Sequence, residues 1–323
     1  MTRPSTIAVV AGALGAVLLV AAMQQSLFGV VLGAMLSPLP LAMAVLGLGV
    51  NVLPLAVVSG AVTVTVLTGS FALAFAYLIM DAIPVAVFSR LKAAAQAENG
   101  TAFVSGASIG RIVCLLTVGI TAVLVLSLAL IPAGPEGIEA SLRERLEEVL
   151  KMVAAANIVA QDGMNTPEDR AELLRVLAGV LPAALAIHWT LRSILSTGLA
   201  HIALKRMDLA DGLTPDFRKF ELPNWFVVPM GVLLAVALVA GGNTGFVAAS
   251  AAAVLSLPVA LQGLAVVHEA AAQTRHRVTV LIAFYVLALL MASAAVVMLV
   301  TLGLAEQIFK IRTRHFAAGT GGE

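Results

Sequence analysis

The chain has 323 residues, of which 60% are hydrophobic and 11% are charged, and its formal net charge at pH 7 is +1. Because a soluble domain carries roughly 25% charged residues, this composition excludes a soluble protein and indicates an integral membrane protein. The near-neutral charge argues against a nucleic-acid partner or a strongly acidic one. The single cysteine, Cys114, excludes an intramolecular disulfide and a metal site built from several cysteines.

Nine apolar runs follow one another along the chain, most of them continuous over about 17–25 residues, as in membrane-spanning helices. Strands of a membrane β-barrel would alternate over about 10 residues. We therefore predict an all-α polytopic bundle of eight or nine spans, forming one integral membrane domain over residues 1–323. The runs are Ile7–Met23, Leu27–Leu48, Val52–Leu67, Phe71–Phe88, Ile112–Ile131, Val176–Leu204, Phe226–Ala240, Phe246–Val267 and Val278–Leu302.

The first two runs need separate comment. Arg3 precedes the first run as in a signal peptide, but no small-x-small cleavage site follows, so we expect a retained helix. Ser37-Pro38-Leu39-Pro40 interrupts the second run, because each proline removes a helix donor and clashes with the preceding turn. Broken helices at membrane depth are tolerated only where they are buried or line a cavity.

Residues 133–174 form the one substantial polar insertion, with nine of the eighteen acids and four bases. Glu139–Val153 places its apolar residues on one face and predicts an amphipathic extramembrane helix. Thr166 and Pro167 are typical of a helix start, with Thr166 as the cap. The insertion is expected to lie on the bundle, and a lid over a substrate entrance is the alternative.

The distribution of Lys and Arg predicts the orientation, with a cytoplasmic N-terminus. Nine full spans would place the basic tail, with Lys310, Arg312 and Arg314, outside, against this rule. Whether the chain crosses the membrane eight or nine times therefore stays open. The residues that fit the cytoplasmic side are Arg3, Arg90, Lys92, Lys205, Arg206, Arg218, Lys219, Arg275 and Arg277.

Two opposite charges, Asp81 and Arg192, lie near the middle of apolar runs. A charge at the bilayer centre costs at least about 2.5–3.5 kcal/mol, so the two predict either a buried ion pair or a polar site. His188, Arg192 and Ser196 share one helical face, and Tyr77 precedes Asp81 by one turn, placed to donate a hydrogen bond to it.

Gln262 adds a further polar group in the eighth run. Together with the two charges and their neighbours it would suit a small polar or anionic solute, with Arg192 as anchor and Asp81 orienting or neutralising it. Two alternatives remain open: an ion pair that only fixes helix register, and unpaired residues facing a wet cavity.

Other chemistry finds no support in the sequence. His268-Glu269 and His276 match no zinc signature and are expected to anchor the chain at the membrane edge. No nucleotide-binding glycine pattern, nucleophile motif or cofactor site is evident. We therefore expect no catalytic residue, metal or cofactor, and no enzymatic activity.

Several short segments resemble the DUF2232 or YybS-like family of uncharacterised bacterial membrane proteins. This resemblance implies a multipass protein of the bacterial inner membrane, but no established catalytic residues. Ser196 stands where members of the family commonly have asparagine, and Glu306 and Lys310 stand where their closing motif carries aspartates. The segments are LPAALAIHWTL from Leu181, FRKFELPNW over Phe217–Trp225, LSLPVALQGLAVVHE over Leu255–Glu269, Tyr285, LGLAEQIFKIRTR over Leu302–Arg314, and SPLPLAMAVLGLGV over Ser37–Val50.

That family is in turn distantly similar to the substrate-binding S-components of energy-coupling-factor vitamin transporters. Those proteins dock a coupling subunit through a small-residue stripe on the first helix. Ala8, Gly12 and Ala16 form such a stripe here, although in a chain this rich in alanine and glycine we prefer ordinary helix packing as its explanation. The resemblance thus implies a solute-binding, transport-related protein that needs a further membrane subunit.

Two functions compete at this point. The preferred one is a solute-binding, transport-related membrane protein. The alternative is a non-transporting scaffold or assembly factor, which would dock protein partners through the acidic insertion and the basic tail. Beyond the lipid bilayer itself, the sequence identifies no specific partner.

Overall fold

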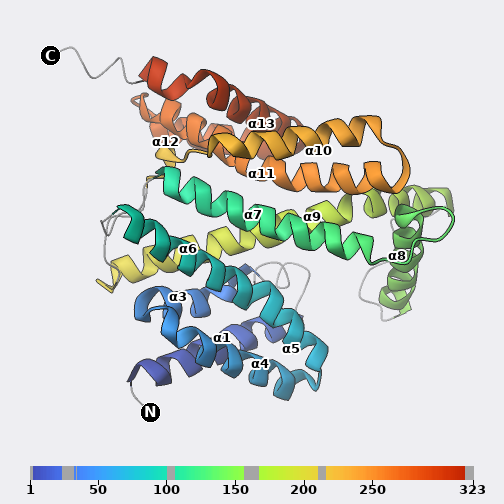
Figure 1. The fold of residues 1–323 in the computed structure, drawn as a ribbon, viewed down its shortest axis with the longest axis horizontal. Helices are drawn as coiled ribbons and strands as arrows, with labels where there is room; N and C mark the ends of the chain where they lie inside the picture. The colour runs from blue at the N-terminus through green and yellow to red at the C-terminus, as the bar shows by residue number, and fades with distance from the viewer. Residues whose placement is uncertain are drawn as a thin grey trace. The chain divides into compact units, whose positions relative to one another are not determined.

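The computed structural model describes residues 3–23, 33, 35–99, 106–155, 167–209 and 216–316, and these residues are almost entirely helical (Figure 1). The prediction of an all-helical chain is confirmed. The chain divides into two compact units. Unit 1 comprises Met1–Leu116 and Trp189–Glu221, and unit 2 comprises Thr117–His188 and Leu222–Glu323.

Two helices contribute residues to both units: α7 (Gly106–Ala129) and the 40-residue α9 (Pro167–Arg206). The other elements of unit 1 are α1 (Arg3–Met23), α3 (Pro38–Leu48), η1 (Val50–Val52), α4 (Leu53–Thr68), α5 (Phe71–Tyr77), the π-helical turn η2 (Leu78–Ala82), α6 (Ile83–Asn99) and η3 (Phe217–Lys219). Those of unit 2 are α8 (Ile138–Ala155), η4 (Asn224–Phe226), α10 (Val227–Val239), α11 (Gly242–Ala272), α12 (Arg277–Leu290), α13 (Ala292–Phe309) and η5 (Arg312–Phe316).

Seven helical segments within the described residues are long and apolar enough to cross a membrane. Three shorter apolar helices accompany them: Pro38–Leu48, Asn224–Val239 and Arg277–Leu290. A helical multipass membrane protein is therefore confirmed, and the number of crossings stays a prediction. The seven segments are Arg3–Ala22, Val50–Thr68, Phe71–Arg90, Ala107–Ala129, Glu168–Arg206, Gly242–Ala272 and Ala292–Phe309.

The sequence predicts one helix for the ninth apolar run, but the structure has two helices there. The run is divided at Met291, whose backbone (φ −121°, ψ 50°) is not helical, into α12 and α13. α12 has 14 residues and is about 21 Å long, which is less than the roughly 30 Å of a hydrocarbon core. Neither glycine nor proline lies at the break, so the apolar pattern alone could not reveal it.

The expected break in the second run is present. Ser37 forms a turn in which its N–H donates to the carbonyl of Gly33 at 3.0 Å, and α3 begins at Pro38. α3 then ends at Gly49, whose φ of 93° lies in the left-handed region that glycine tolerates. The backbone of Ser37 itself keeps helical angles (φ −57°, ψ −35°), so the proline pair interrupts the helix at this residue with little change in local conformation. Residues 27–32 and 34 of the second run lie outside the described residues.

Small residues bring helices of unit 1 into close contact. The stripe formed by Ala8, Gly12 and Ala16 packs against α4, and the two alanines are buried. A side chain at Gly12 would collide with the carbonyl group of Ala56. The structure thus uses this stripe for packing within the chain, and its predicted role in docking another subunit stays a prediction.

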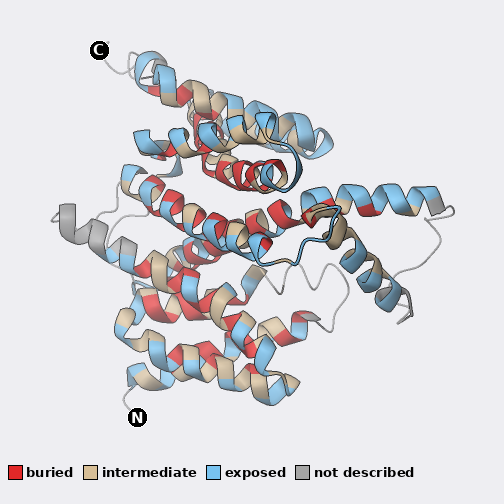
Figure 2. Cartoon of the chain, turned by 45° about the vertical axis from the view of Figure 1, so that its right-hand side comes forward, coloured by how far each residue is buried: buried red, intermediate tan, exposed pale blue. Residues whose placement is uncertain are grey.

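The core of unit 2 is centred on α11, most of whose middle residues are buried, whereas α12 has no buried residue (Figure 2). Gly263 and Gly303 form the contact between α11 and α13. A side chain at Gly263 would collide with the carbonyl of Leu299, and one at Gly303 with that of Val259. Close backbone approach therefore holds a helix pair together in this unit as well.

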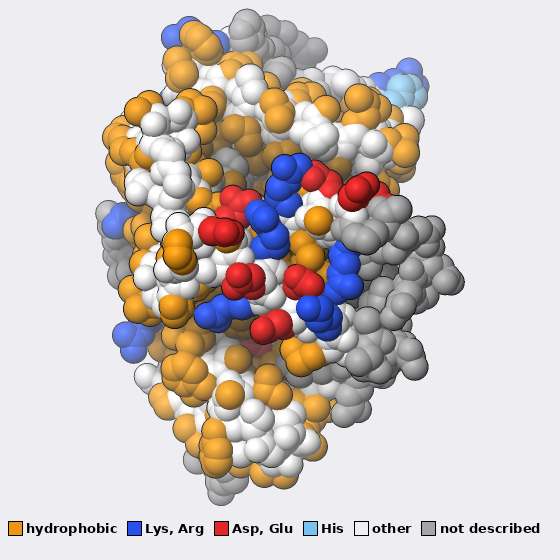
Figure 3. Space-filling model, turned by 90° about the vertical axis from the view of Figure 1, so that its right-hand side faces the viewer, with side chains coloured by type: hydrophobic (Ala, Val, Ile, Leu, Met, Phe, Trp, Pro, Cys, Tyr) orange, Lys and Arg blue, Asp and Glu red, His pale blue; other side chains and the backbone are white. Residues whose placement is uncertain are grey.

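The polar insertion contains the predicted amphipathic helix as α8, and α9 begins at Pro167 as predicted. The proposed cap, Thr166, lies outside the described residues. Acidic and basic side chains gather on one face of the molecule (Figure 3). Two ion pairs on α8 join Glu139 with Arg143 and Glu147 with Lys151, and one on α9 joins Glu172 with Arg175.

Candidate functional site

Asp81 and Arg192 form a buried ion pair in unit 1. Asp81 is 0% exposed and Arg192 is 4% exposed. The same guanidinium nitrogen, Nη2, donates to Asp81 Oδ1 and, at 2.8 Å, to Ser37 Oγ. Ser37 Oγ donates in turn to Asp81 Oδ2 at 2.8 Å. The three side chains thus form a closed polar triad, and the predicted partnership between the two charges is confirmed.

Three elements of unit 1 bring this triad together. Ser37 lies in the turn before α3, and Asp81 lies within the π-helical turn η2 between α5 and α6. Arg192 projects from the middle of α9. Single π-helical turns inserted into α-helices are frequent at functional sites. The position of Asp81 in the triad therefore depends on a local backbone irregularity that a regular helix would not provide.

Tyr77 does not make the hydrogen bond to Asp81 that one helical turn of spacing suggested. The π-helical turn begins at Leu78, directly after Tyr77, and includes Asp81, so it changes the angular relation that an α-helix would give the two residues. The Tyr77 ring lies against Gly60, where any side chain would overlap it, and its hydroxyl lies near Gly15. Tyr77 is 1% exposed, and its hydroxyl has no hydrogen-bond partner among the described residues.

A second buried donor, the Nε–H of Arg192 in the triad, also has no hydrogen-bond partner within the part of the chain that the structure describes. Buried polar groups in native proteins are nearly always hydrogen-bonded, so two such donors in one small region require an explanation. A tyrosine hydroxyl and a guanidinium N–H both donate hydrogen bonds. An acceptor atom from a bound molecule would satisfy them.

The remaining residues predicted for this site have different surroundings. Ser196 is buried and donates to the carbonyl of Met35 at 2.8 Å, so it ties α9 to the segment before Ser37. His188 is half-buried, one turn before Arg192 on α9. Trp189, which we had not assigned to the site, donates from Nε1 to the carbonyl of Met80 at 2.9 Å. That carbonyl immediately precedes Asp81.

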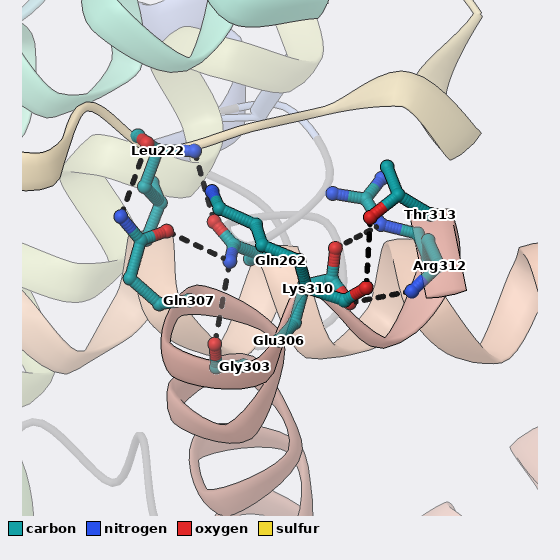
Figure 4. A network of polar contacts seen from close by, with 8 residues as sticks. All are labelled: Leu222, Gln262, Gly303, Glu306, Gln307, Lys310, Arg312 and Thr313. Atoms are coloured by element: carbon teal, nitrogen blue, oxygen red, sulfur yellow. Dashed lines mark hydrogen bonds and ion pairs between the residues drawn. The ribbon is translucent and has the colours of Figure 1, made fainter. Parts of the chain in front are cut away.

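Gln262 belongs to a different polar cluster, in unit 2 (Figure 4). Its side-chain oxygen accepts from the N–H of Leu222 at 2.8 Å, and its Nε2 donates to the carbonyl of Gly303 at 3.3 Å and to Gln307 Oε1 at 3.1 Å. Gln307 Nε2 also donates to Asn224 Oδ1 at 3.0 Å. Gln262 is 1% exposed, and this clasp holds the chain at Leu222 to α11 and α13.

A second ion pair follows the clasp at the end of α13. Glu306 accepts from the Arg312 side chain at 2.9 Å and from the Arg312 backbone N–H at 3.0 Å. Lys310 between them has a φ of 52°, unusual for a residue other than glycine. Arg312, counted as part of a basic tail from the sequence, is therefore largely buried against Glu306. Sequence reasoning had missed this pair because a helix end cannot be located from charge alone.

Comparison with known families identifies the chain. Residues 13–305 match DUF2232, described as a predicted membrane protein. The chain belongs to the DUF2232 family. No curated protein and no solved structure matches it.

The clasp and the pair that follows it bring together three of the segments that carry the likeness to DUF2232 proteins. Leu222 comes from FRKFELPNW, Gln262 from LSLPVALQGLAVVHE, and Glu306 from LGLAEQIFKIRTR. Ser37 of the triad belongs to a fourth such segment, whereas Asp81 and Arg192 lie outside these motifs. The clasp thus joins segments in which the sequence resembles the family, and all three residues of the triad lie within residues 13–305, which match the family.

Proposed function

We propose that this DUF2232 protein binds a small polar solute within the membrane and has a transport-related role, with Arg192 as the anchor of the site. The observation that carries the proposal is the buried Asp81–Arg192–Ser37 triad together with the two unpartnered donors beside it.

The free-energy cost of burying two charges supports a functional interpretation of the triad. Transferring two charges out of water costs several kcal/mol each, and apolar replacements of buried pairs are often as stable as the pair itself. Ionisable residues inside membrane proteins therefore commonly mark solute or ion pathways. The π-helical turn at Asp81 and the unpartnered donors add features that a purely structural pair does not need.

Small molecules that remain bound during purification in mild detergent would test this function. Extracts of the wild-type protein and of Arg192→Leu would be compared by mass spectrometry. Ser193→Ala is the matched control, because Ser193 is equally buried on the same helix but donates only to the carbonyl of Trp189. We expect one compound in the wild-type and control extracts and its loss from Arg192→Leu. Equal retention in all three would refute the assignment of the site.

We further propose that the protein lies in a bacterial inner membrane with a cytoplasmic N-terminus and eight or nine crossings. The support is the distribution of Lys and Arg between the apolar segments. Single cysteines introduced near Arg3 and near Lys310, after Cys114 has been replaced by alanine, would report the side of each end to an impermeant thiol reagent. Labelling of the Arg3 cysteine from outside would refute this orientation.

A scaffold that docks a protein partner is the second candidate, and the mixed-charge face of α8 and the start of α9 supports it (Figure 3). An open cavity of about 370 Å³ adjoins Glu136 and Glu139 in unit 2. If this function is correct, reversing the exposed charges Glu144 and Glu148 should abolish recovery of a partner, whereas Arg192→Leu should leave it unchanged. The opposite pattern would favour the solute-binding function.

A further inference from the structure

The hydrogen-bond inventory of the triad defines what a bound molecule must supply. Both oxygens of Asp81 already accept hydrogen bonds, one from Arg192 and one from Ser37. The two groups without partners, Arg192 Nε and the Tyr77 hydroxyl, can each donate. A solute that fits this site must therefore bring acceptor oxygens, and a guanidinium group favours a carboxylate above other acceptors.

Charge imposes a second requirement. Arg192 and Asp81 are together neutral, and they are buried. A carboxylate that bound beside them would leave one uncompensated negative charge in a desolvated site, at a cost of several kcal/mol. A proton on Asp81 removes that cost, because the site then holds one cation and one anion.

Asp81 is the group placed to take this proton. Among the elements packed against its π-helical turn, α3 and α4 carry no titratable side chain, and α5 contributes Tyr77. On α6, the basic residues begin with Arg90, more than two turns beyond Asp81. On α9, Arg192 faces Asp81, with His188 one turn before Arg192 and His201 more than two turns after it.

We propose that the site takes a solute carboxylate together with one proton, the carboxylate binding Arg192 and the proton entering on Asp81. This inference rests on the proposed function. The proton comes from water and forms an O–H bond on the Asp81 carboxyl group, and no other covalent bond changes. Ser37 suits this exchange because a hydroxyl both donates and accepts. It now accepts from Arg192 and donates to Asp81, and it can accept from a protonated Asp81 instead.

Trp189 offers a direct optical readout, since its indole N–H binds the carbonyl of Met80 beside Asp81. The chain has two tryptophans, so Trp225→Phe leaves Trp189 as the only one. The probe is trifluoroacetate, a carboxylate that stays ionised across the range used, so that any proton taken up enters on the protein. Its binding to the full-length protein in detergent would be followed by Trp189 fluorescence between about pH 6 and about pH 8.

We expect the apparent affinity to fall about tenfold for each unit of rising pH, as uptake of one proton requires. Asp81→Asn, which resembles the protonated acid, should bind the probe with an affinity that does not change with pH. Tyr77→Phe should bind it more weakly, and Arg192→Leu should not bind it. Ser193→Ala should behave like the parent protein.

The outcomes separate this inference from the function on which it rests. Binding that requires Arg192 but is independent of pH in the parent protein would overturn proton coupling and leave a solute site in place. No response to trifluoroacetate, with an Arg192-dependent response to acetamide or methylammonium, would overturn the carboxylate class alone. Equal responses to all three probes in the parent protein and in Arg192→Leu would overturn the solute site itself.

Discussion

Removing one charge from the triad should destabilise the protein strongly, and the two possible removals should differ in their dependence on pH. Arg192→Met leaves the Asp81 carboxylate buried with Ser37 as its remaining donor. Asp81→Asn leaves the Arg192 guanidinium buried without a counter-charge. Breaking a buried pair in this way costs about 3–5 kcal/mol. Because about 1.4 kcal/mol is a factor of ten, the unfolding equilibrium should shift by at least about a hundredfold.

The two variants differ because only one of the stranded charges can neutralise itself. A carboxylate without a counter-charge can take up a proton, whereas a guanidinium stays charged at any pH that a protein tolerates. The loss caused by Arg192→Met should therefore shrink as the pH falls, and the loss caused by Asp81→Asn should not. The double variant has no buried charge and should be at least about 3 kcal/mol more stable than either single variant.

Cys114 provides the assay, since it is the only cysteine and is fully buried. A thiol-reactive dye reports its exposure as purified protein unfolds in detergent, by heat or by denaturant. Ser193→Ala serves again as a control for the loss of a buried polar contact on α9. Single variants that each lose less than about 1 kcal/mol, or a double variant as unstable as the sum of the two, would refute the reasoning.

Three further predictions test the packing and the polar contacts outside the triad. Gly12→Ala should lower the melting temperature, because overpacking costs about 1–3 kcal/mol, whereas Gly198→Ala, in open space on α9, should raise it slightly. Gln262→Leu should speed hydrogen exchange at the Leu222 amide, and by leaving that buried N–H unpaired it should cost about 1–3 kcal/mol. The hydrogen bond from Arg218 holds the pKa of Asp216 below its ordinary value. This interaction therefore stabilises the protein fully at pH values above the ordinary pKa, and the stabilisation is lost as the pH falls through the lowered pKa. In a plot of melting temperature against pH, Asp216→Asn should therefore remove the fall in this pH range. An unchanged plot would contradict the assignment.

The fold could be predicted from the sequence wherever a break has a chemical marker. Pro38 and Pro40 mark the interruption of the second run, and Pro167 marks the start of α9. The break at Met291 has no such marker. The π-helical turn at Asp81 is followed by Pro84, which lacks the N–H that an α-helix would donate to the Met80 carbonyl, but the apolar pattern alone does not predict that a π-helical turn results. Hydropathy records how much apolar surface a segment has. It does not record the hydrogen-bonding register of its backbone.

The candidate site could be predicted only in part. Electroneutrality in a low-dielectric interior was enough to pair Asp81 with Arg192, since each would be costly alone. The same argument could not place Tyr77, because the orientation of its side chain depends on the π-helical turn. It also could not assign Gln262 to a different cluster from the two charges, because a lone amide has no charge that identifies its partner. Ser37 was recognisable only as a neighbour of proline.

The same reasoning explains why Ser37 completes the triad. A serine inside a regular helix commonly donates to the carbonyl four residues earlier, as Ser193 does to Trp189 here. The Ser37 N–H bonds the carbonyl of Gly33 four residues earlier, as in a regular helix, but the Ser37 hydroxyl donates to Asp81 on another element. This long-range bond places at the triad a hydroxyl that both accepts and donates, as a site that exchanges a proton for a solute requires.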